Sequence, residues 1–211
     1  MNLQGGIHMR KGYAMAAATV FFWGTMSPLT KVLLQGLSNQ EVLFFGALIA
    51  FLTLFAVAVV SGHWKNWKTY SGKDVLQLVL LGVGGNYLYS TLYYYGLKVL
   101  PAQDACVVNY LWPMMTVLFS CIILKEKLNG RKVLAGALSF AGVVVLATKG
   151  RGLTGAGGNW KGLFCCALAA VCYGAFNVLN KRKGKDQIVN MTVYFLVTAV
   201  CSGFGMAGKG T

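Results

Sequence analysis

The chain of 211 residues is 56% apolar, only 11% of its residues are charged, and its mean hydropathy is +0.60. Soluble domains carry about 25% charged residues, so this composition excludes a soluble globular domain, a disordered chain and a disulfide-bonded framework. The net charge is +14, but the basic residues lie between long apolar runs. We therefore predict an all-α integral membrane protein that resides in the lipid bilayer and has no nucleic-acid partner.

Seven apolar runs without Asp, Glu, Lys or Arg predict seven transmembrane helices. A hydrocarbon core of about 30 Å needs about 20 helical residues, and six of the seven runs come close to this length or exceed it. The fifth is short, but basic residues flank it, and their stems can reach the headgroups. The runs are residues 12–30, 42–64, 75–97, 105–124, 133–148, 162–180 and 187–208.

The distribution of basic residues predicts a cytoplasmic N-terminus. With this orientation, the cytoplasmic segments hold 13 of the 19 Lys and Arg residues, namely Arg10, Lys11, Lys65, Lys68, Lys73, Lys125, Lys127, Arg131, Lys132, Lys181, Arg182, Lys183 and Lys185. The other six are Lys31, Lys98, Lys149, Arg151, Lys161 and Lys209. An excess of basic residues inside is the usual rule, so we expect a multi-pass protein of the cell (inner) membrane.

A weak internal repeat suggests how the helices are organised. A shift of 150 residues aligns Lys11-Gly12 with Lys161-Gly162 and Trp23-Gly24 with Tyr173-Gly174. A unit of five helices inserts upside down in its second copy, which is a recurrent design of secondary transporters. We expect residues 12–149 to form the first five-helix repeat and residues 158–211 to begin the second. With two helices in the second copy, we interpret the sequence as C-terminally truncated.

Several motifs resemble those of one transporter family. They are Trp23-Gly24 in the first run, Pro101 before the fourth, Pro113 within it, and Leu124-Lys125-Glu126-Lys127-Leu128 leading into Gly136 and Gly142-Val143. The five-helix unit is similar to the EamA domain of the drug/metabolite transporter superfamily. The string from Val108 to Pro113 is similar to one in bacterial aromatic amino-acid exporters of that superfamily. The resemblance implies ten helices with both termini cytoplasmic.

Polar and aromatic residues form one stripe on each of four predicted helices, at 100° per residue. Such stripes either hold helices together through hydrogen bonds or line a cavity. The residues that we select as candidates for a substrate cavity are Trp23, Ser27, Asn86, Tyr94, Asn109, Tyr110, Trp112, Pro113, Tyr173 and Asn177. Asn109 is the main candidate, because Pro113 cannot donate a hydrogen bond to its carbonyl within a continuous helix.

Asp104 has two interpretations. It is either an acid in the first turn of its helix, facing the positive end of the helix dipole, or a carboxylate that couples transport to protons. Asp104 and Asn109 lie 140° apart around a helix, which argues against a shared cavity. Glu126 has basic neighbours, which favours a structural ion pair.

We expect no metal site and no cofactor. The six cysteines lie inside apolar runs without a CxxC spacing, and His8 and His63 lie in a tail and a loop. The string from Gly203 to Gly208 reads GxGxxG, but no strand precedes it, so helix packing is the simpler explanation.

The primary functional hypothesis is a secondary transporter that exports amino acids or similar small metabolites by alternating access around a midplane cavity. The alternatives are a non-transporting membrane scaffold or inactive truncated product, and a membrane-embedded enzyme. An enzyme would need acids, bases or metal ligands within the bilayer, and the predicted helices offer few, so we expect none. Small residues such as Ala135, Ala137, Ser139 and Ala141 would allow a homodimer.

Overall fold

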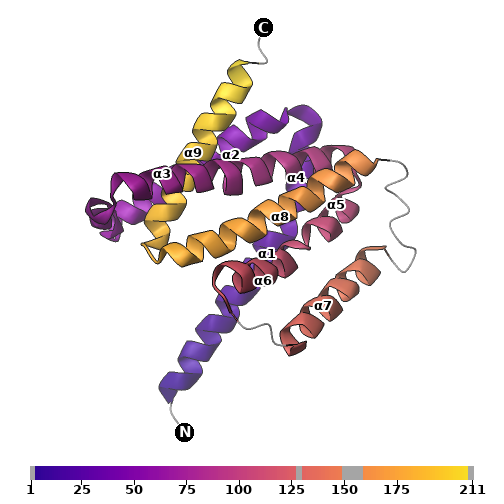
Figure 1. Ribbon diagram of the computed structural model, residues 1–211, viewed down its shortest axis with the longest axis horizontal. Coiled ribbons are helices and arrows are strands. Elements are labelled where there is room, and N and C mark those ends of the chain that lie inside the picture. Colours follow the sequence, from indigo (N-terminus) through magenta and orange to yellow (C-terminus); the bar gives the residue numbers. More distant parts are fainter. Residues whose placement is uncertain (1–2, 127–129, 149–158, 209–211) are drawn as a thin grey trace.

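The computed structural model describes residues 3–126, 130–148 and 159–208, and its regular elements there are all helical. Figure 1 shows them in order. They are α1 (Leu3–Gly36), α2 (Asn39–Val60), the 3₁₀ segment η1 (His63–Thr69), α3 (Gly72–Leu81), the π-helical segment η2 (Gly82–Tyr87), α4 (Leu88–Val99), α5 (Ala102–Asn109), α6 (Trp112–Ile123), α7 (Gly130–Thr148), α8 (Trp160–Lys183) and α9 (Gln187–Ala207).

Within the described residues, five helical segments are long and apolar enough to cross a membrane. They are Asn39–Val60, Gly72–Val99, Ala102–Ile123, Trp160–Arg182 and Gln187–Ala207. The other two predicted runs are helical as well and lie within α1 and α7, but they are outside this set. In α1, Gly, Thr, Ser and Pro residues interrupt the apolar stretch. The predicted all-α membrane class is confirmed.

Helix α8 lies alongside α4 in the centre of the molecule and also packs against α5 and α6 (Figure 1). Glycines permit the close approach. A Cβ atom at Gly85 would lie 2.2 Å from the ring of Phe176, and one at Gly96 would lie 2.1 Å from Sγ of Cys166. Helix α9 packs along α2.

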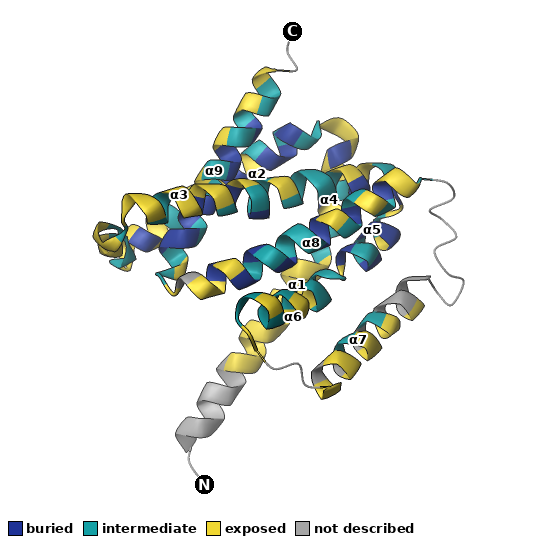
Figure 2. Cartoon of the chain, viewed as in Figure 1, coloured by how far each residue is buried: buried dark blue, intermediate teal, exposed yellow. Residues whose placement is uncertain are grey.

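Helix α1 is the least covered of the long helices. Residues 12–24 are all exposed, whereas buried residues recur along α8 and α9 (Figure 2). Helix α7 stands apart in Figure 1 and packs only lightly on α5 and α6. Of the small residues expected at a dimer contact, Ala137 and Ala141 are exposed on α7. The side chains of Ala135 and Ser139 lie outside the described set.

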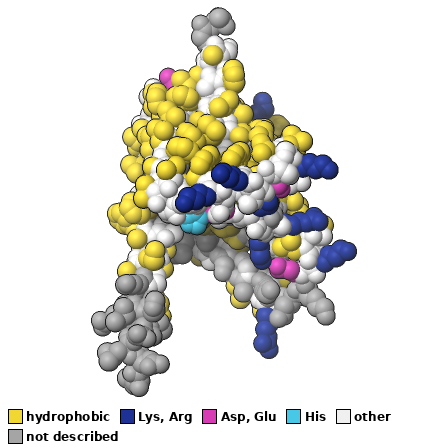
Figure 3. Space-filling model, turned by 90° about the vertical axis from the view of Figure 1, so that its left-hand side faces the viewer, with side chains coloured by type: hydrophobic (Ala, Val, Ile, Leu, Met, Phe, Trp, Pro, Cys, Tyr) yellow, Lys and Arg dark blue, Asp and Glu magenta, His cyan; other side chains and the backbone are white. Residues whose placement is uncertain are grey.

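The loops predicted to be cytoplasmic meet at one end of the molecule. His63 Nδ1 lies 2.6 Å from the carboxylate of Asp186, and Lys181 forms an ion pair with Glu126 at 3.3 Å. The first contact joins η1 to the start of α9, and the second confirms the ion pair expected for Glu126. We call this end, formed by residues 61–74, 125–126 and 181–190, the basic end; residues 127–129 lie outside the described part. Figure 3 looks toward it and shows several Lys and Arg side chains.

Residues near the end of α1, the end of α4 and the start of α8 meet at the opposite end. The ammonium group of Lys31 donates to the carbonyls of Leu97, at 2.7 Å, and Leu100. Asn159 donates to the carbonyl of Val99 at 3.3 Å. Successive membrane segments therefore alternate between the basic end and this opposite end, as a multi-pass bundle requires.

Candidate functional site

Aromatic rings from four helices form a continuous cluster. The ring of Trp23 on α1 lies 6.2 Å from that of Trp112 on α6, and Trp112 lies 5.3 Å from Tyr173 on α8. Tyr173 stacks on Tyr89 of α4 at 4.5 Å. Edge-to-face and offset stacking at these distances is the preferred geometry for aromatic pairs. Tyr93 and Phe176 extend the cluster, at 6.0 Å from Tyr89 and 5.9 Å from Tyr173.

Asn109 brings a polar group to this aromatic cluster. Its amide nitrogen donates to the hydroxyl of Tyr89 at 3.3 Å, and the residue is only 9% exposed. Its Oδ1 atom is buried and has no hydrogen-bond partner among the described residues. Leaving a buried acceptor unpaired costs about 1–3 kcal/mol. The site therefore has an unused acceptor beside aromatic faces, which suits a ligand with an N–H donor.

A break in the membrane segment explains the position of Asn109. Helix α5 ends at Asn109 and α6 begins at Trp112. Between them, the N–H of Leu111 donates to the carbonyl of Val108 at 3.1 Å, which is a tight turn rather than a continued α-helix. Pro113 then falls in the first turn of α6, where no intrahelical donor is needed.

The membrane segment predicted over residues 105–124 is present as the candidate span Ala102–Ile123, but a turn at residues 110–111 divides its helix into α5 and α6. A helix interrupted just before the proline avoids the clash that a mid-helix proline would create. As a consequence, Pro113 does not act by freeing an Asn109 carbonyl inside a continuous helix. Tyr110 is 45% exposed and Pro113 is also exposed.

Helix α1 contacts the site through two polar groups. The hydroxyl of Ser27 lies 2.9 Å from that of Tyr93, which in turn lies 3.3 Å from the thiol of Cys106 on α5. Tyr94 faces Thr30, which is 7% exposed. Tyr94 thus lies beside α1 and packs against the same core cluster as Tyr89. Trp23 is 54% exposed, so one side of the aromatic cluster is open at α1.

Asn86 lies elsewhere, against α9. Its amide donates to the hydroxyl of Thr198 at 2.9 Å. Asn86 belongs to the π-helical segment η2, whose wider turn shifts the faces of all residues around it. The stripe that a uniform 100° per residue predicts for Asn86 and Tyr94 is therefore not formed. Asn177 is half-buried on α8, one turn after Tyr173.

Sequence reasoning missed Tyr89 and Phe176. Tyr89 accepts the hydrogen bond from Asn109 and stacks on Tyr173. Phe176 lies against Gly85 and also contacts the ring of Tyr194 at 5.0 Å. The spacing of Tyr89 and Tyr93, one helical turn apart, is the signal that could have identified Tyr89.

Asp104 lies at the other end of α5 from Asn109. It lies in the first turn of α5, is 7% exposed, and has a buried Oδ2 atom with no hydrogen-bond partner among the described residues. Asn109 ends the same helix. The two unpaired acceptors therefore lie in the first turn and at the last residue of α5.

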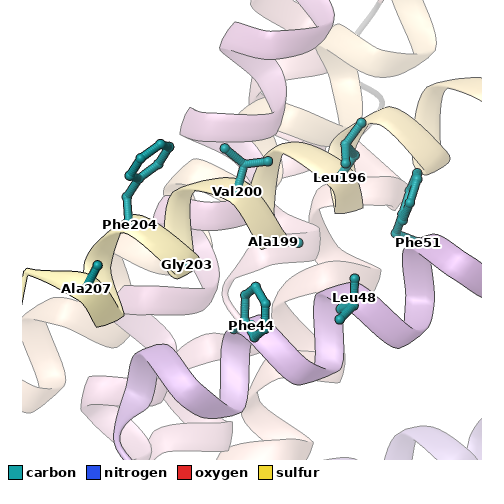
Figure 4. Close-up of a pocket in the computed structure, with 9 residues that line it drawn as sticks. All are labelled: Phe44, Leu48, Phe51, Leu196, Ala199, Val200, Gly203, Phe204 and Ala207. Carbon is teal, nitrogen blue, oxygen red and sulfur yellow. The ribbon is translucent and has the colours of Figure 1, made fainter.

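An apolar groove between α2 and α9 is separate from the aromatic cluster (Figure 4). It is lined by Phe44, Leu48, Phe51, Leu196, Ala199, Val200, Gly203, Phe204 and Ala207. None of these has a polar side chain, so the groove does not provide the hydrogen bonds that fix a polar ligand.

At the basic end, polar contacts join η1 and Tyr70 to the start of α9. Asp186 accepts from Asn66 at 2.7 Å in addition to its contact with His63, and the hydroxyl of Tyr70 donates to Asn190 at 2.8 Å. Burial acts to raise the pKa of Asp186, but the hydrogen bonds from His63 and Asn66 outweigh it and hold the pKa below its ordinary value. Burial and the nearby charge of Asp186 raise the pKa of Tyr70 to about 12.

Comparisons with known proteins relate this chain to membrane transporters. Residues 10–148 match the EamA-like transporter family. An aromatic amino acid exporter, YddG, of Ancylobacter novellus is 31% identical over 122 residues, covering 57% of this chain and 42% of the relative. An uncharacterized transporter of Clostridium kluyveri is 26% identical over 179 residues, covering 83% of this chain and 57% of the relative.

A further relative and one solved structure extend the comparison. The pseudopaline exporter CntI of Pseudomonas aeruginosa is 27% identical, with 57% of this chain and 40% of the relative covered. A crystal structure superposes with a TM-score of 0.71 at 24% identity, covering 89% of this chain and 63% of that chain, and it supports the fold alone. The chain spans about half the length of the curated relatives it matches.

Proposed function

The chain belongs to the EamA-like transporter family, and on this basis we propose that it works as a secondary transporter of the cell membrane that exports amino acids or related small metabolites. The observation that carries the proposal is the unpaired, buried Oδ1 atom of Asn109 beside the aromatic cluster. A polar acceptor at the break of a membrane-spanning segment is a recurrent feature of substrate sites in secondary transporters.

The site chemistry favours a small molecule with an apolar part and an N–H donor. The faces of Tyr89, Trp112 and Tyr173 suit an apolar or aromatic side chain. The oxygen of Asn109 suits an ammonium or amide donor. The name of the Ancylobacter relative, an aromatic amino acid exporter, supports an amino acid as the substrate class.

The correspondence between the first two and the last two helices suggests how the site opens to one side of the membrane and then to the other. With an offset of about 150 residues, α1 and α2 correspond to α8 and α9, and α2 packs against α9. This pairing supports the proposed inverted repeat, in which one unit moves against the other around a fixed site. The contacts of Asp186 and Asn190 with η1 and Tyr70 join the two units at the basic end. We assign this end to the cytoplasm and regard it as closed.

The test is a vesicle assay with the full-length protein of the reading frame that contains this chain. Asn109→Leu should reduce counterflow of radiolabelled aromatic amino acids at least tenfold, because the acceptor for the substrate N–H is lost. The matched control is Thr53→Leu, because Thr53 is exposed on α2 and donates only to the carbonyl of Ile49 in its own helix. The control should transport normally.

Folding and transport are measured in parallel. The melting temperature of Asn109→Leu should stay within a few degrees of the unmodified protein, since the substitution removes an unpaired buried oxygen. If Asn109→Leu transports normally, or loses activity only in proportion to folded protein, the site assignment is wrong. If the unmodified protein neither binds nor transports any amino acid, the proposed substrate class is wrong.

A further inference from the structure

The turn between α8 and α9 contacts η1 through the carboxylate of Asp186. The Oδ1 atom caps α9, because it accepts from the N–H groups of Ile188 and Val189 at 3.0 and 3.3 Å. The Oδ2 atom lies 2.6 Å from Nδ1 of His63 and accepts from the amide of Asn66 at 2.7 Å. The side chain of Asp186 is only 12% exposed. The two carboxylate oxygens therefore have separate tasks, since one begins a helix of the second proposed repeat and the other holds η1 of the first.

Lys185, the residue before Asp186, contacts the first repeat as well. Its ammonium group donates to the carbonyl of Thr69 at 2.8 Å and lies 3.6 Å from the carboxylate of Asp74 in α3. The same ammonium group lies 5.1 Å from the centre of the Tyr70 ring, which is within the range of a cation–π contact. Two adjacent residues of one short turn thus bind two elements of the first repeat, η1 and α3.

Hydrogen bonds continue from this turn into the bundle. The hydroxyl of Tyr70 donates to Oδ1 of Asn190 at 2.8 Å, and the amide of Asn190 donates to Oδ1 of Asn180 on α8 at 3.4 Å. The hydroxyl of Tyr194 donates to the same Asn180 oxygen at 3.0 Å. Asn180, Asn190 and Tyr194 are each at most 7% exposed. Opening this region separates buried partners, and a buried polar group that is left unpaired costs free energy unless water enters with it.

A buried and largely apolar cluster lies between these contacts and Tyr173. Its four members are each at most 7% exposed, and they are Leu78, Phe176, Val193 and Tyr194. Trp67 and Tyr70 pack against it from the basic end, and Tyr173 of the aromatic cluster packs against it as well. We call these four residues the apolar plug. Water reaches Tyr173 from the basic end through this region only if η1 and α3 move away from α9.

We propose that Asp186, Lys185 and Tyr70 form a latch that keeps the substrate site closed to the cytoplasm, and that the latch opens when η1 and α3 part from α9. The inference rests on the proposed function and its orientation. Because Oδ1 of Asp186 caps α9 while Oδ2 holds η1, the latch opens without unwinding α9. The strength of the latch sets the fraction of molecules that are open to the cytoplasm, and therefore the apparent affinity for cytoplasmic substrate.

The first test measures access to the apolar plug from the cytoplasmic side. Val193→Cys is the reporter, introduced into the full-length protein on a background without native cysteines, because Val193 belongs to the plug and is 7% exposed. In inverted membrane vesicles, Asp186→Ser should raise the rate at which the reporter reacts with an impermeant thiol reagent by about tenfold or more. Serine still caps α9 but has no second oxygen to hold η1. In right-side-out vesicles this rate should not rise.

Tyr70→Phe tests the latch by a second route, because it removes the hydroxyl that donates to Asn190 and keeps the ring that stacks on Trp67. It should raise the reaction rate of the reporter by about threefold or more. Lys181→Gln is the matched control at the same end. It breaks the ion pair with Glu126, in which the two side chains are 70% and 43% exposed, and an exposed ion pair contributes little stability. The control should react within about twofold of the parent protein.

Transport kinetics distinguish a latch from a contact that only stabilises the fold. A weaker latch enlarges the fraction of molecules open to the cytoplasm. Asp186→Ser should therefore lower the KM for a radiolabelled aromatic amino acid at the cytoplasmic face by about threefold or more, and it should raise the KM at the outer face. Loss of folded protein alone would lower the maximal rate at both faces and leave both KM values unchanged.

The latch is refuted if Asp186→Ser leaves the reaction rate of the reporter unchanged, or, where that variant does not fold, if Tyr70→Phe leaves it unchanged. It is also refuted if Lys181→Gln accelerates the reaction as strongly as Asp186→Ser, or if the reaction accelerates from the outer side instead. Labelling requires no substrate. An unmodified protein that neither binds nor transports any amino acid would therefore refute the proposed function, whatever the labelling shows.

Discussion

Gly174 offers a direct test of the central packing between α8 and α6. A Cβ atom at this position would lie 2.6 Å from Cβ of Met115 and 2.9 Å from the backbone nitrogen of Thr116. Backbone atoms cannot rotate out of the way as a side chain can. Gly174→Ala therefore forces the two helices apart by roughly 1 Å to restore ordinary van der Waals contact.

The magnitude follows from the cost of overpacking. Inserting one methyl group into a well-packed interior costs about 1–3 kcal/mol. For a chain of 150–250 residues, each kcal/mol shifts the melting temperature by about 2–4 °C. A cost of about 2 kcal/mol thus predicts a fall of roughly 4–8 °C for Gly174→Ala. Because Tyr173 precedes Gly174 and stacks on Tyr89, substrate affinity should fall as well.

The assay is thermal unfolding in detergent, followed by tryptophan fluorescence. Gly46→Ala is the matched control, because a Cβ atom at Gly46 on α2 would meet nothing within 4 Å. The control should melt at the same temperature or slightly higher, since Ala favours a helix over Gly by about 1 kcal/mol. If Gly174→Ala and Gly46→Ala melt together, the close contact of α8 with α6 is not present in the folded protein.

Two further predictions concern the basic end. Asp186→Asn should lower the melting temperature at pH 7 and flatten its decline in acid. The pKa of the Asp186 carboxylate is held below its ordinary value of about 4, so the carboxylate stabilises the fold above pH 4 and this stabilisation is lost as the pH falls through the lowered pKa. Identical acid profiles for the two proteins would contradict the contacts of Asp186 with His63 and Asn66. Single cysteines in residues 61–74 and 184–190, on a background without native cysteines, should resist impermeant thiol reagents in intact cells, whereas a cysteine at Leu37 should react. Labelling of residues 184–190 from outside would reverse the orientation.

The fold class and the grouping of the loops could be predicted from the sequence because both depend on charge. A charged side chain is expensive inside the bilayer, so each charge-free run marks a helix, and each cluster of Lys and Arg marks a connection. The contacts of Asp186 with His63 and of Lys181 with Glu126 join the loops that the sequence assigns to one side. Helix α1 is an intermediate case. It is helical, but its scattered polar residues make it less apolar than the five candidate spans.

The details of the site could not be predicted in the same way, because they depend on irregular backbone. The π-helical segment Gly82–Tyr87 changes the phase of the residues before and after it, and this separates Asn86 from Tyr89 and Tyr93. The glycines at positions 82, 84 and 85 mark the segment, but a glycine-rich run alone does not distinguish a π-helix from close helix packing. Pro113 indicated an irregularity, yet not that the helix would end at Asn109.

The two irregular points at the ends of α5 make this short helix a mechanical unit that carries two buried, unpaired oxygens. Helix α5 is an eight-residue unit between Pro101 and the turn at Tyr110, and a helix of that length spans about 12 Å. Asp104 lies in its first turn and Asn109 at its last position, each with a buried unpaired oxygen. Because an α-helix this short moves as a rigid body, while the flanking turns absorb changes in backbone angles, a rotation that exposes one acceptor also moves the other. A ligand that pairs with Asn109 and shifts α5 therefore also changes the surroundings of Asp104, without any direct contact between the two side chains.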